Sequence, residues 1–296
     1  MKIKLNKILE DFAKRKGIIA GICDAEPLIN IESLLAETDT PFVSKNIKKR
    51  IDPKISLKNA KSVIVIGVNY NKKYDFVCDD ELRGIISIYA AQEDYHITLR
   101  HLLDELVLDI KQSIGNFNYK ILADSGSLVE KELAIKTGLG FYGKNSLVIS
   151  ERFGSLFFIG CLLTDIEVDL DEISRPILKD CESCNKCVKA CPTNAIDNGK
   201  LDSDKCISYL TQKRGDLSIQ ESNLIGNWLY GCDICQAACP HNKQTPAKSI
   251  KSVDQAMPKI SEIMNISDEE FTLRFGNTVI NWAGKETIMR NAKHIY

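Results

Sequence analysis

CESCNKCVKACP, residues 181–192, carries four cysteines in the pattern C-x2-C-x2-C-x3-C-P. A second stretch, GCDICQAACPHN at residues 231–242, repeats the end of this pattern with three more cysteines, and Cys206 lies between the two. Eight of the eleven cysteines therefore fall within one segment of the chain. So many thiols at these spacings indicate a metal-binding segment rather than packing.

The spacing is typical of a bacterial ferredoxin segment with two 4Fe-4S clusters. Three cysteines separated by two residues can bind three corners of one cluster, and the last cysteine of each motif crosses to the other cluster in such proteins. The predicted ligands are Cys181, Cys184, Cys187 and Cys239 for one cluster, and Cys191, Cys206, Cys232 and Cys235 for the other. Two structural zinc sites are the alternative, because C-x2-C pairs also bind zinc. Zinc explains neither the third cysteine of the first motif nor the repeated x3-C-P ending, so the pattern favours clusters.

The remaining composition is that of an ordinary globular protein, with 296 residues, 44% hydrophobic, 27% charged and a net charge of -1. Residues 1–17 predict an amphipathic helix without the apolar core of a signal peptide. The longest apolar run, residues 62–68, suits a buried strand and is too short to span a membrane. We therefore expect a cytoplasmic protein with reduced cysteines. The three cysteines outside the motifs are expected to be small buried residues: Cys23, Cys78 and Cys161.

The segment before the cysteines predicts a layered α/β domain. The expected elements are strands at 62–70 and 119–124, helices at 94–110 and 127–138, and a hairpin over 145–165 with its turn at Arg152 to Gly154. The first of these helices should bury one face, formed by Leu99, Leu102, Leu103, Leu106 and Ile110. Domains of this class usually hold a ligand at the ends of their strands.

GLGFYG, residues 138–143, matches the G-x-G-x-x-G pattern of dinucleotide-binding proteins. That pattern should follow a strand and open a helix, whereas this one follows an expected helix and leads into an expected strand. It is therefore weak evidence for a nicotinamide cofactor. Two interpretations stay open: a loop whose backbone approaches something closely, and a plain turn that ends a helix.

Several motifs, taken in this order along the chain, resemble the epoxyqueuosine reductase family. They are DYH at 94–96, ADSG at 123–126, GLGFYGKNSLVIS at 138–150, FFIGCLLTD at 157–165, CPTNAI at 191–196, CISYLT at 206–211 and GCDICQAACPHN at 231–242. The resemblance implies an α/β (α+β) cobalamin-binding domain related to that of reductive dehalogenases, followed by a ferredoxin-like domain with two clusters and a short helical tail. The corresponding domains are residues 1–170, 171–250 and 251–296. The chain is expected to be a short form that lacks most of the C-terminal helical repeats.

The activity implied by the resemblance is the cobalamin-dependent reduction of epoxyqueuosine to queuosine at the wobble position of tRNA. The two 4Fe-4S clusters would deliver electrons to cobalamin, which carries out the difficult step while the protein orients it and supplies protons. The D-x-H-x-x-G motif that provides a histidine ligand to cobalamin is absent. This agrees with a cobalamin held without a protein axial ligand, as the resemblance implies.

Asp124 is the expected general acid and also a cobalamin contact. It ends the strand YKILAD and enters a glycine-containing turn, where a carboxyl can face a strand-end pocket. Proton donation near neutral pH requires a raised pKa, which a partly desolvated site provides. The alternative is an aspartate that caps the helix expected to begin near Ser127. The resemblance favours the acid.

Further cobalamin contacts are expected on the same resemblance, and they are Tyr95, His96, Lys144, Asn145 and Ser208. For the first two, a structural role at the start of a helix is the alternative. Ser208 is included because it stands beside the predicted ligand Cys206. The sequence departs from the family pattern at Ile88 and Gln92, where arginine and glycine are expected.

The expected partner is the tRNA anticodon stem-loop that carries epoxyqueuosine. The strongest local positive charge is formed by Lys45, Lys48, Lys49, Arg50, Lys54, Lys58 and Lys61, against the single acid Asp52. Such a run can bind phosphates, and a solvated surface face is the alternative. A second basic group could add to the same footprint: Lys213, Arg214, Lys285, Arg290 and Lys293.

Two other functions fit the same features. One is a cobalamin and iron-sulfur reductase with another substrate, such as a dehalogenase-like enzyme, and the other is a noncatalytic electron carrier. Retention of cobalamin separates both enzyme functions from the carrier. A monomer and an unidentified low-potential electron donor complete the expectations.

Overall fold

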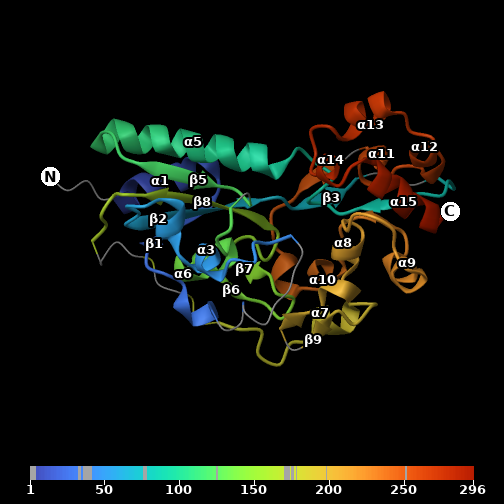
Figure 1. The fold of residues 1–296 in the computed structure, drawn as a ribbon, viewed down its shortest axis with the longest axis horizontal. Helices are drawn as coiled ribbons and strands as arrows, with labels where there is room; N and C mark the ends of the chain where they lie inside the picture. The colour runs from blue at the N-terminus through green and yellow to red at the C-terminus, as the bar shows by residue number, and fades with distance from the viewer. Residues whose placement is uncertain are drawn as a thin grey trace. The chain divides into compact units, whose positions relative to one another are not determined.

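The computed structural model describes most of the chain. The described residues are 5–32, 35, 42–75, 79–124, 126–169, 174, 177, 179–197, 199–250 and 252–296. They form two compact units. Figure 1 draws the chain as a ribbon coloured from the N-terminus to the C-terminus. Within the described residues, unit 1 comprises 1–69, 96–142 and 147–180, and unit 2 comprises 70–95, 143–146 and 181–296. The predicted domain boundaries at residues 170 and 250 stay a prediction, and Cys78 lies outside the described residues.

Unit 1 is built on a four-stranded antiparallel sheet. Its strands, in spatial order, are β1 (Ile19–Asp24), β2 (Ser62–Asn69), β8 (Phe157–Thr164) and β5 (Tyr119–Leu122). The apolar run predicted as a buried strand is β2, at the centre of the sheet. The register pairs Ser62 with Thr164, and their buried hydroxyl oxygens lie 2.8 Å apart. The unit is therefore an α+β layer structure, as expected for the fold class.

Two helices cover one face of this sheet (Figure 1). The long helix α5 (Tyr95–Ile114) packs on β8 at Gly160, where an added Cβ would lie 3.1 Å from Leu103 and 3.2 Å from Leu99. The predicted apolar face is confirmed at Leu99, Leu103, Leu106 and Ile110, which are all fully buried, whereas Leu102 is only partly buried. Helix α1 (Leu5–Lys16) lies beside α5 and forms ion pairs with it through Arg15 and Lys16.

Helix α6 (Glu130–Lys136) packs on the opposite face of the sheet. Leu133 and Ala134 share an apolar cluster with β2 and β8 residues whose side chains alternate away from α5. The end of α6 approaches β1 so closely that a Cβ on Gly21 would lie 2.4 Å from the carbonyl oxygen of Thr137. The short helices α3 (Ile47–Ile51), α4 (Pro53–Ser56) and η1 (Ile29–Ile31) complete unit 1.

GLGFYG combines both interpretations that the sequence left open. Gly138 has a φ of 71° and ends α6, since its N–H and that of Leu139 donate to the carbonyls of Ile135 and Ala134. Gly140 serves close approach, because a Cβ there would lie 2.3 Å from the carbonyl oxygen of Ile149. The close partner is the chain's own backbone, so the glycines are explained without a dinucleotide.

The hairpin predicted over residues 145–165 is wrong. Strand β7 (Val148–Ile149) pairs with β6 (Phe141–Tyr142), and β8 joins the main sheet instead. The expected turn closes only a single antiparallel bridge between Ser150 and Gly154. There the Ser150 hydroxyl accepts a hydrogen bond from the Phe153 N–H, and the Phe153 ring is buried. The turn exists, but the long apolar β8 buries more surface as a sheet strand than it would against the two-residue β7.

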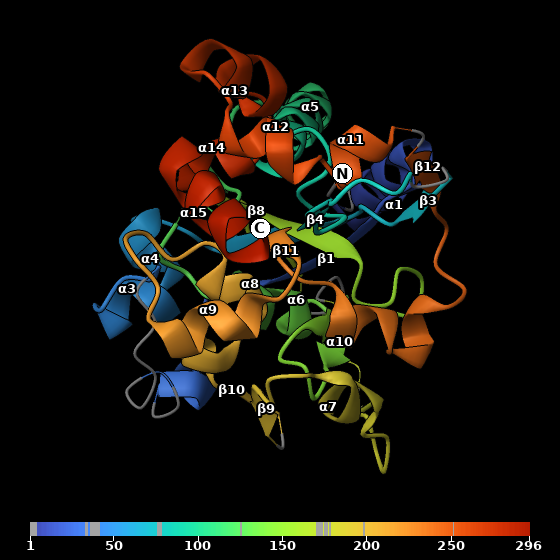
Figure 2. The ribbon, with the colours of Figure 1, turned by 90° about the vertical axis from the view of Figure 1, so that its right-hand side faces the viewer.

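Unit 2 joins early and late parts of the chain by parallel pairing. Strand β4 (Ile85–Ile86) pairs with β11 (Trp228–Tyr230), and β3 (Lys72–Tyr74) pairs with β12 (Lys248–Ile250). The cysteine segment adds α7 (Lys186–Ala190), β9 (Ile196–Asp197), β10 (Lys200–Leu201), η3 (Ser203–Lys205), α8 (Ile207–Leu210), α9 (Ile219–Ile225), α10 (Ile234–Ala237) and η4 (Pro240–Asn242). The remaining helices are α11 (Val253–Ala256), α12 (Ile260–Met264), α13 (Asp268–Phe275), α14 (Ile280–Ala283) and α15 (Lys285–Ile295). Within the unit, α11 to α15 gather at one end and α7 to α10 at the other (Figure 2).

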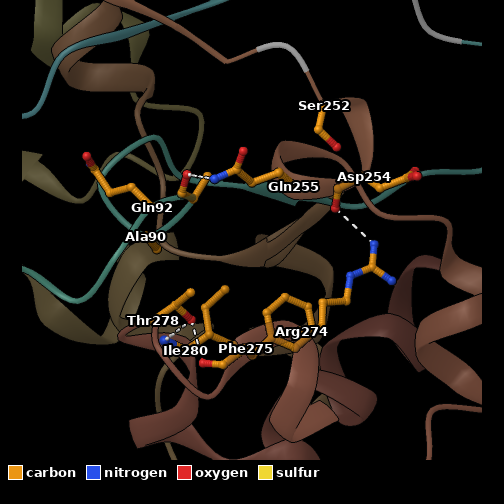
Figure 3. A pocket seen from close by; sticks show the side chains of 10 residues that line it. Ala90, Gln92, Ser252, Asp254, Gln255, Arg274, Phe275, Thr278 and Ile280 are labelled. Atoms are coloured by element: carbon orange, nitrogen blue, oxygen red, sulfur yellow. Dashed lines mark hydrogen bonds between the residues drawn. The ribbon is translucent and has the colours of Figure 1, made fainter. Parts of the chain in front are cut away.

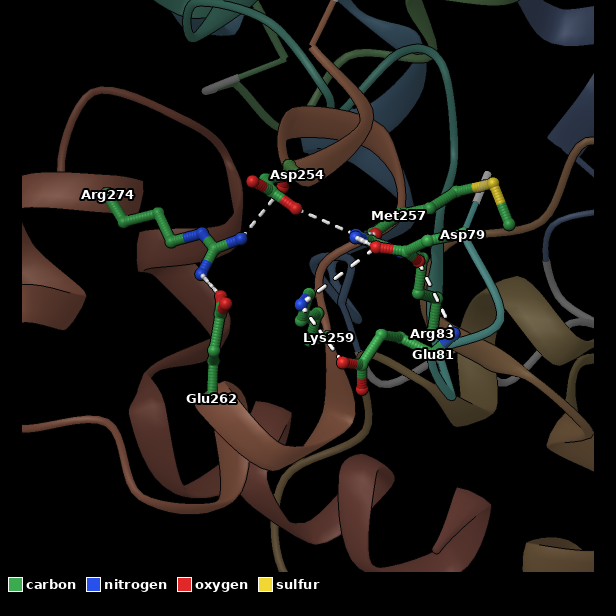
Figure 4. A network of polar contacts seen from close by, with 8 residues as sticks. All are labelled: Asp79, Glu81, Arg83, Asp254, Met257, Lys259, Glu262 and Arg274. Atoms are coloured by element: carbon green, nitrogen blue, oxygen red, sulfur yellow. Dashed lines mark hydrogen bonds and ion pairs between the residues drawn. The ribbon is translucent and has the colours of Figure 1, made fainter. Parts of the chain in front are cut away.

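A buried arginine ties the start of unit 2 to its late helices (Figure 4). Arg83 is 7% exposed and donates to both carboxylate oxygens of Asp79 at 2.8 and 2.9 Å. Its remaining nitrogen donates to Asp254 and to the carbonyl oxygen of Met257, both at 2.7 Å. The guanidinium lowers the pKa of Asp79 to about 2 through these hydrogen bonds. The four hydrogen bonds make Arg83 the polar centre of this part of the fold.

Among the residues that the structure describes, no helix is long and apolar enough to cross a membrane.

Candidate functional site

The predicted cluster ligands lie on the loops and short helices of unit 2. Cys187 is in α7 and Cys191 ends that helix, where its N–H donates to the Cys187 carbonyl at 3.2 Å. Cys206 precedes α8, Cys235 is in α10, and Cys239 precedes η4. All eight thiols are free of disulfides. The short elements hold the thiols at helix ends, where a cluster can reach them.

The thiols fall into two groups by their mutual charge interactions. Burial raises the pKa of Cys239, and nearby Cys181, Cys187 and Cys184 raise it further. Burial also raises the pKa of Cys232 to about 12, with added contributions from Asp233, Cys206 and Cys191. These neighbours are the ones that the crossed ligand sets predict, and the assignment of the thiols to two 4Fe-4S clusters stays a prediction.

One thiol of the second set, that of Cys235, also interacts with a thiol of the first set. The pKa of Cys235 is raised to about 12 by burial and by Cys232, Cys206, Cys187 and Cys191, in that order. Cys187 thus reaches across from the first set. Among the described residues no three His, Cys, Asp or Glu side chains form a group that could hold one metal ion, and the ligand sets stay a prediction.

Asp233 fastens the second cysteine loop to β4. Its carboxylate accepts hydrogen bonds from the Ser87 hydroxyl and from the Ile88 N–H, the latter at 2.8 Å. Burial raises the pKa of Asp233 to about 6, while these two hydrogen bonds oppose the rise. The motif position between Cys232 and Cys235 is therefore anchored from outside the cysteine segment.

Lys144 and Asn145 belong to unit 2, in the turn between β6 and β7. The Lys144 ammonium donates to the Glu182 carbonyl oxygen at 2.8 Å and to the Asn185 Oδ1 at 2.9 Å, both in the first cysteine loop. Glu182 has a φ of 45°, so Lys144 supports a strained point of that loop. Ser146 donates to the Gly199 carbonyl at 3.0 Å and fastens the same turn to the β9–β10 connection. The lysine predicted as a cobalamin contact therefore also braces a cluster loop.

The other predicted cobalamin contacts lie at helix starts. Tyr95 and His96 are the first two residues of α5, and Tyr95 packs against the apolar core of unit 2. Ser208 is in α8, two residues after Cys206, and its hydroxyl accepts a hydrogen bond from the Gln212 amide at 3.2 Å. All three side chains are partly buried.

Asp124 follows the end of β5 and its side chain is exposed. Its φ is 52°, a left-handed conformation that is uncommon for a residue other than glycine. The proposed alternative role as a helix cap is wrong, because α6 begins at Glu130 and its N-cap is Val129, with no side-chain cap. The Val129 N–H instead donates to the Arg50 carbonyl at 3.0 Å. Asp124 is thus an exposed carboxyl at a strand end rather than the partly desolvated one expected, and its role as the acid stays a prediction.

Glu130 completes this site and was not predicted from the sequence. Its two carboxylate oxygens accept the Asp124 N–H at 3.0 and 3.1 Å. The pKa of Glu130 is raised to about 8 by burial and by the charge of Asp124, while the hydrogen bond from the Asp124 N–H opposes the rise. A glutamate six residues after an aspartate belongs to no recognised motif, so only the folded turn brings the two together.

The basic run at 45–61 is partly neutralised within unit 1. Lys54 pairs with Glu26 at 2.8 Å, and Lys61 pairs with Glu167 at 3.3 Å. In the second basic group Lys213 pairs with Glu221 at 2.5 Å, and Arg290 donates to the Leu210 carbonyl at 3.1 Å. These basic residues therefore stabilise the fold through ion pairs and hydrogen bonds, in addition to any contact with phosphates.

Unit 2 also contains a cavity of about 350 Å³ (Figure 3). Its lining is Ala90, Ala91, Gln92, Ser252, Asp254, Gln255, Arg274, Phe275, Thr278 and Ile280. Gln92, one of the departures from the family pattern, folds back so that its amide donates to the Ile88 and Tyr89 carbonyls at 3.0 and 3.3 Å. Arg274 is bound to Glu262 and to the Asp254 carbonyl. The polar groups at this cavity serve the fold.

Two family models match the chain. Residues 180–242 match a 4Fe-4S double cluster binding domain, and residues 50–125 match the model described as Epoxyqueuosine reductase QueG, DUF1730. The first match spans the cysteine segment, and the second ends just after Asp124.

Known proteins resemble the chain over nearly its whole length. The epoxyqueuosine reductase of Lactococcus garvieae (strain Lg2) is 38% identical over 88% of this chain and 76% of its own length. That of Bacillus subtilis (strain 168) is 36% identical over 98% of this chain and 78% of its own. The solved epoxyqueuosine reductase from Streptococcus thermophilus aligns with a TM-score of 0.92 and 34% identity, over 100% of this chain and 81% of that chain.

Two further solved structures bear on function. One is an epoxyqueuosine reductase with a tRNA-Tyr epoxyqueuosine-modified stem loop, which aligns with a TM-score of 0.88 and 34% identity over 98% of this chain and 80% of that chain. The other, from Bacillus subtilis, has an aspartate catalytic loop swung out of the active site, and aligns with a TM-score of 0.90 and 32% identity over the same shares.

Proposed function

Because this chain belongs to the epoxyqueuosine reductase family, we propose that it reduces epoxyqueuosine to queuosine in the anticodon stem-loop of tRNA, with Asp124 as the general acid. The chain is an oxidoreductase with a 4Fe-4S double cluster binding segment. Family membership favours this activity over a dehalogenase-like enzyme and over a noncatalytic carrier. The observation that carries the role of Asp124 is its accessible carboxyl at the end of β5, in a turn held by Glu130.

The chemistry sets what the residues must supply. Both C–O bonds of the epoxide break, a C=C double bond forms, and the oxygen leaves as water, which consumes two electrons and two protons. Cobalamin, when bound, supplies the low-potential reducing power for this step. The two cysteine sets would hold the clusters, which would supply electrons one at a time, and Lys144 steadies the first cysteine loop.

Proton delivery falls to the carboxyl beside the strand end. Asp124 donates a proton to the departing oxygen, because an alkoxide is a poor leaving group without one. The fixed backbone of Asp124 limits where this carboxyl can lie, which favours a productive geometry. Tyr95, His96, Asn145 and Ser208 are proposed to contact cobalamin, in keeping with the resemblance.

The remaining partners follow from the same proposal. The tRNA stem-loop in the solved relative supports tRNA as the substrate, with the basic run at 45–61 as a candidate contact for phosphates. We propose that the protein acts as a monomer in the cytoplasm, where its cysteines stay reduced, and receives electrons from a separate low-potential donor.

The test is turnover of tRNA carrying epoxyqueuosine by anaerobic, cluster-loaded protein with cobalamin and a strong reductant, read by nucleoside mass spectrometry. Conversion to queuosine is expected, and unchanged epoxide with active protein overturns the proposal. Asp124→Asn should keep its iron and bind cobalamin but lose turnover by roughly 100-fold or more. Full activity in that variant would remove Asp124 from the acid role.

A further inference from the structure

Two observations single out the turn that follows β5. Asp124 adopts a φ of 52°, which costs free energy for any residue with a Cβ. Its N–H points at both carboxylate oxygens of Glu130, at 3.0 and 3.1 Å. The contact crosses the turn from the first residue of α6, so one side chain holds the backbone of the proposed acid.

The contact is well suited to hold a strained backbone. A hydrogen bond from an N–H to a carboxylate is charge-assisted and stronger than one to a neutral acceptor. Glu130 is itself fixed, because α6 packs through Leu133 and Ala134 into the apolar core of unit 1. The rigidity of the sheet and helix thereby reaches Asp124 through a single side chain.

We infer that Glu130 is a positioning residue for the reaction: its carboxylate holds the Asp124 backbone in the left-handed conformation and so sets where the Asp124 carboxyl can deliver its proton. The inference rests on the proposed function. Without this contact the turn relaxes to a commoner conformation and the acid moves away from its target. Glu130 acts through Asp124 and needs no contact with the substrate.

The surroundings of Glu130 make the contact dependent on pH. The ionisable group that acts on Glu130 is Asp124, in the turn after β5. Glu130 in turn faces Cys161, a buried residue of β8 whose pKa is raised by burial and by the Glu130 charge. Arg50 of α3 approaches the start of α6 through its backbone. Because the pKa of Glu130 is raised to about 8, its ionised and stronger acceptor form grows as pH rises through that value.

The experiment compares three variants in the full chain loaded with clusters. Glu130→Ala removes the acceptor, Glu130→Gln keeps one neutral acceptor of the same shape, and Glu132→Gln is the matched control. Glu132 is the third residue of the same helix, and its carboxylate is hydrogen-bonded to Tyr142 instead of to Asp124. At pH 9, where Glu130 is mostly ionised, we expect kcat to fall roughly 100-fold for Glu130→Ala and roughly tenfold for Glu130→Gln, with KM within about twofold and the control unaffected.

Hydrogen exchange supplies a readout that does not depend on turnover. Peptides covering residues 123–127 should lose protection at the Asp124 amide in both Glu130 variants and keep it in Glu132→Gln. Protection in the wild type should rise between pH 7 and pH 9, relative to the intrinsic exchange rate, and Glu130→Gln should lose this rise.

The outcomes separate the inference from the function on which it rests. Unchanged exchange and unchanged kcat in Glu130→Ala overturn the positioning role, even if Asp124→Asn is inactive. A wild-type protein without turnover overturns the proposed function, while altered exchange in the Glu130 variants still supports the contact. Iron content equal to wild type shows that a variant has folded.

Discussion

Paired cysteine-to-alanine replacements test whether the last cysteine of each motif crosses to the other cluster. In the crossed arrangement Cys181 and Cys239 bind the same cluster, so the loss of both costs no more iron than the loss of either. Cys181 and Cys191 then belong to different clusters, and their joint loss removes both. Without crossing the two outcomes are exchanged, because Cys191 would share the cluster of Cys181.

The magnitude follows from the thiol groups described above. The thiols that act most strongly on Cys239 are those of Cys181, Cys187 and Cys184, which favours crossing. With two 4Fe-4S clusters the wild type should hold about eight irons per chain. The Cys181→Ala, Cys239→Ala protein should hold about four and the Cys181→Ala, Cys191→Ala protein about none. Alanine is chosen because a serine oxygen can still bind iron.

Iron and acid-labile sulfide are measured after anaerobic reconstitution, with the electron paramagnetic resonance spectrum of the reduced protein as a second readout. Cys23→Ala is the control, because Cys23 is buried in unit 1 and should leave about eight irons in place. An empty Cys181→Ala, Cys239→Ala protein beside a half-loaded Cys181→Ala, Cys191→Ala protein would refute the crossed sets. Bound zinc without sulfide would refute clusters altogether.

Three further changes probe the scaffold. Gly140→Ala should destabilise unit 1 by about 1–3 kcal/mol, because the new methyl group meets the backbone of β7, and calorimetry should show a smaller loss for Gly160→Ala, whose neighbours are movable side-chain tips. Arg83→Met should cost about 1–3 kcal/mol in urea unfolding, below the usual loss for a buried ion pair, because its carboxylate partners are half exposed and regain water; an unchanged midpoint would contradict this role. Lys144→Met should lower the reduction potential of the first cluster by on the order of 30 mV, and by more than Lys186→Met, which removes an exposed charge from the same loop; equal shifts would argue against the brace.

Local patterns predicted the features whose cause is local. The apolar run predicted β2, and the helical period predicted the buried face of α5. Asp124 was placed at a strand end because the strand YKILAD and the following turn are both legible in sequence. The bounds of α6 were less certain, since residues 127–129 continue the pattern but the helix begins only at Glu130.

The features that sequence reasoning missed depend on contacts between distant residues. Strand β7 pairs with β6 instead of β8, a choice that two-residue strands cannot signal. Lys144 donates a hydrogen bond to the Glu182 carbonyl oxygen, and nothing in the sequence around a lysine in a turn predicts such a partner. Glu130 meets Asp124 only because Asp124 adopts a left-handed conformation, and the sequence does not predict that conformation for a residue other than glycine.

The parallel pairing in unit 2 has a consequence for how the protein is made. Strand β4 is synthesised long before its partner β11, which pairs Trp228 with Ile85, and β3 long before β12, which pairs Lys248 with Lys72. At about 5–20 residues per second, a ribosome exposes the early strands for roughly 10–30 s before their partners emerge. During that interval each early strand has an open edge. The yield of folded protein in bacteria should therefore depend on chaperone supply and on a low growth temperature as much as on iron. A fragment that starts at the cysteine motif would lack β3 and β4, the partners of β12 and β11.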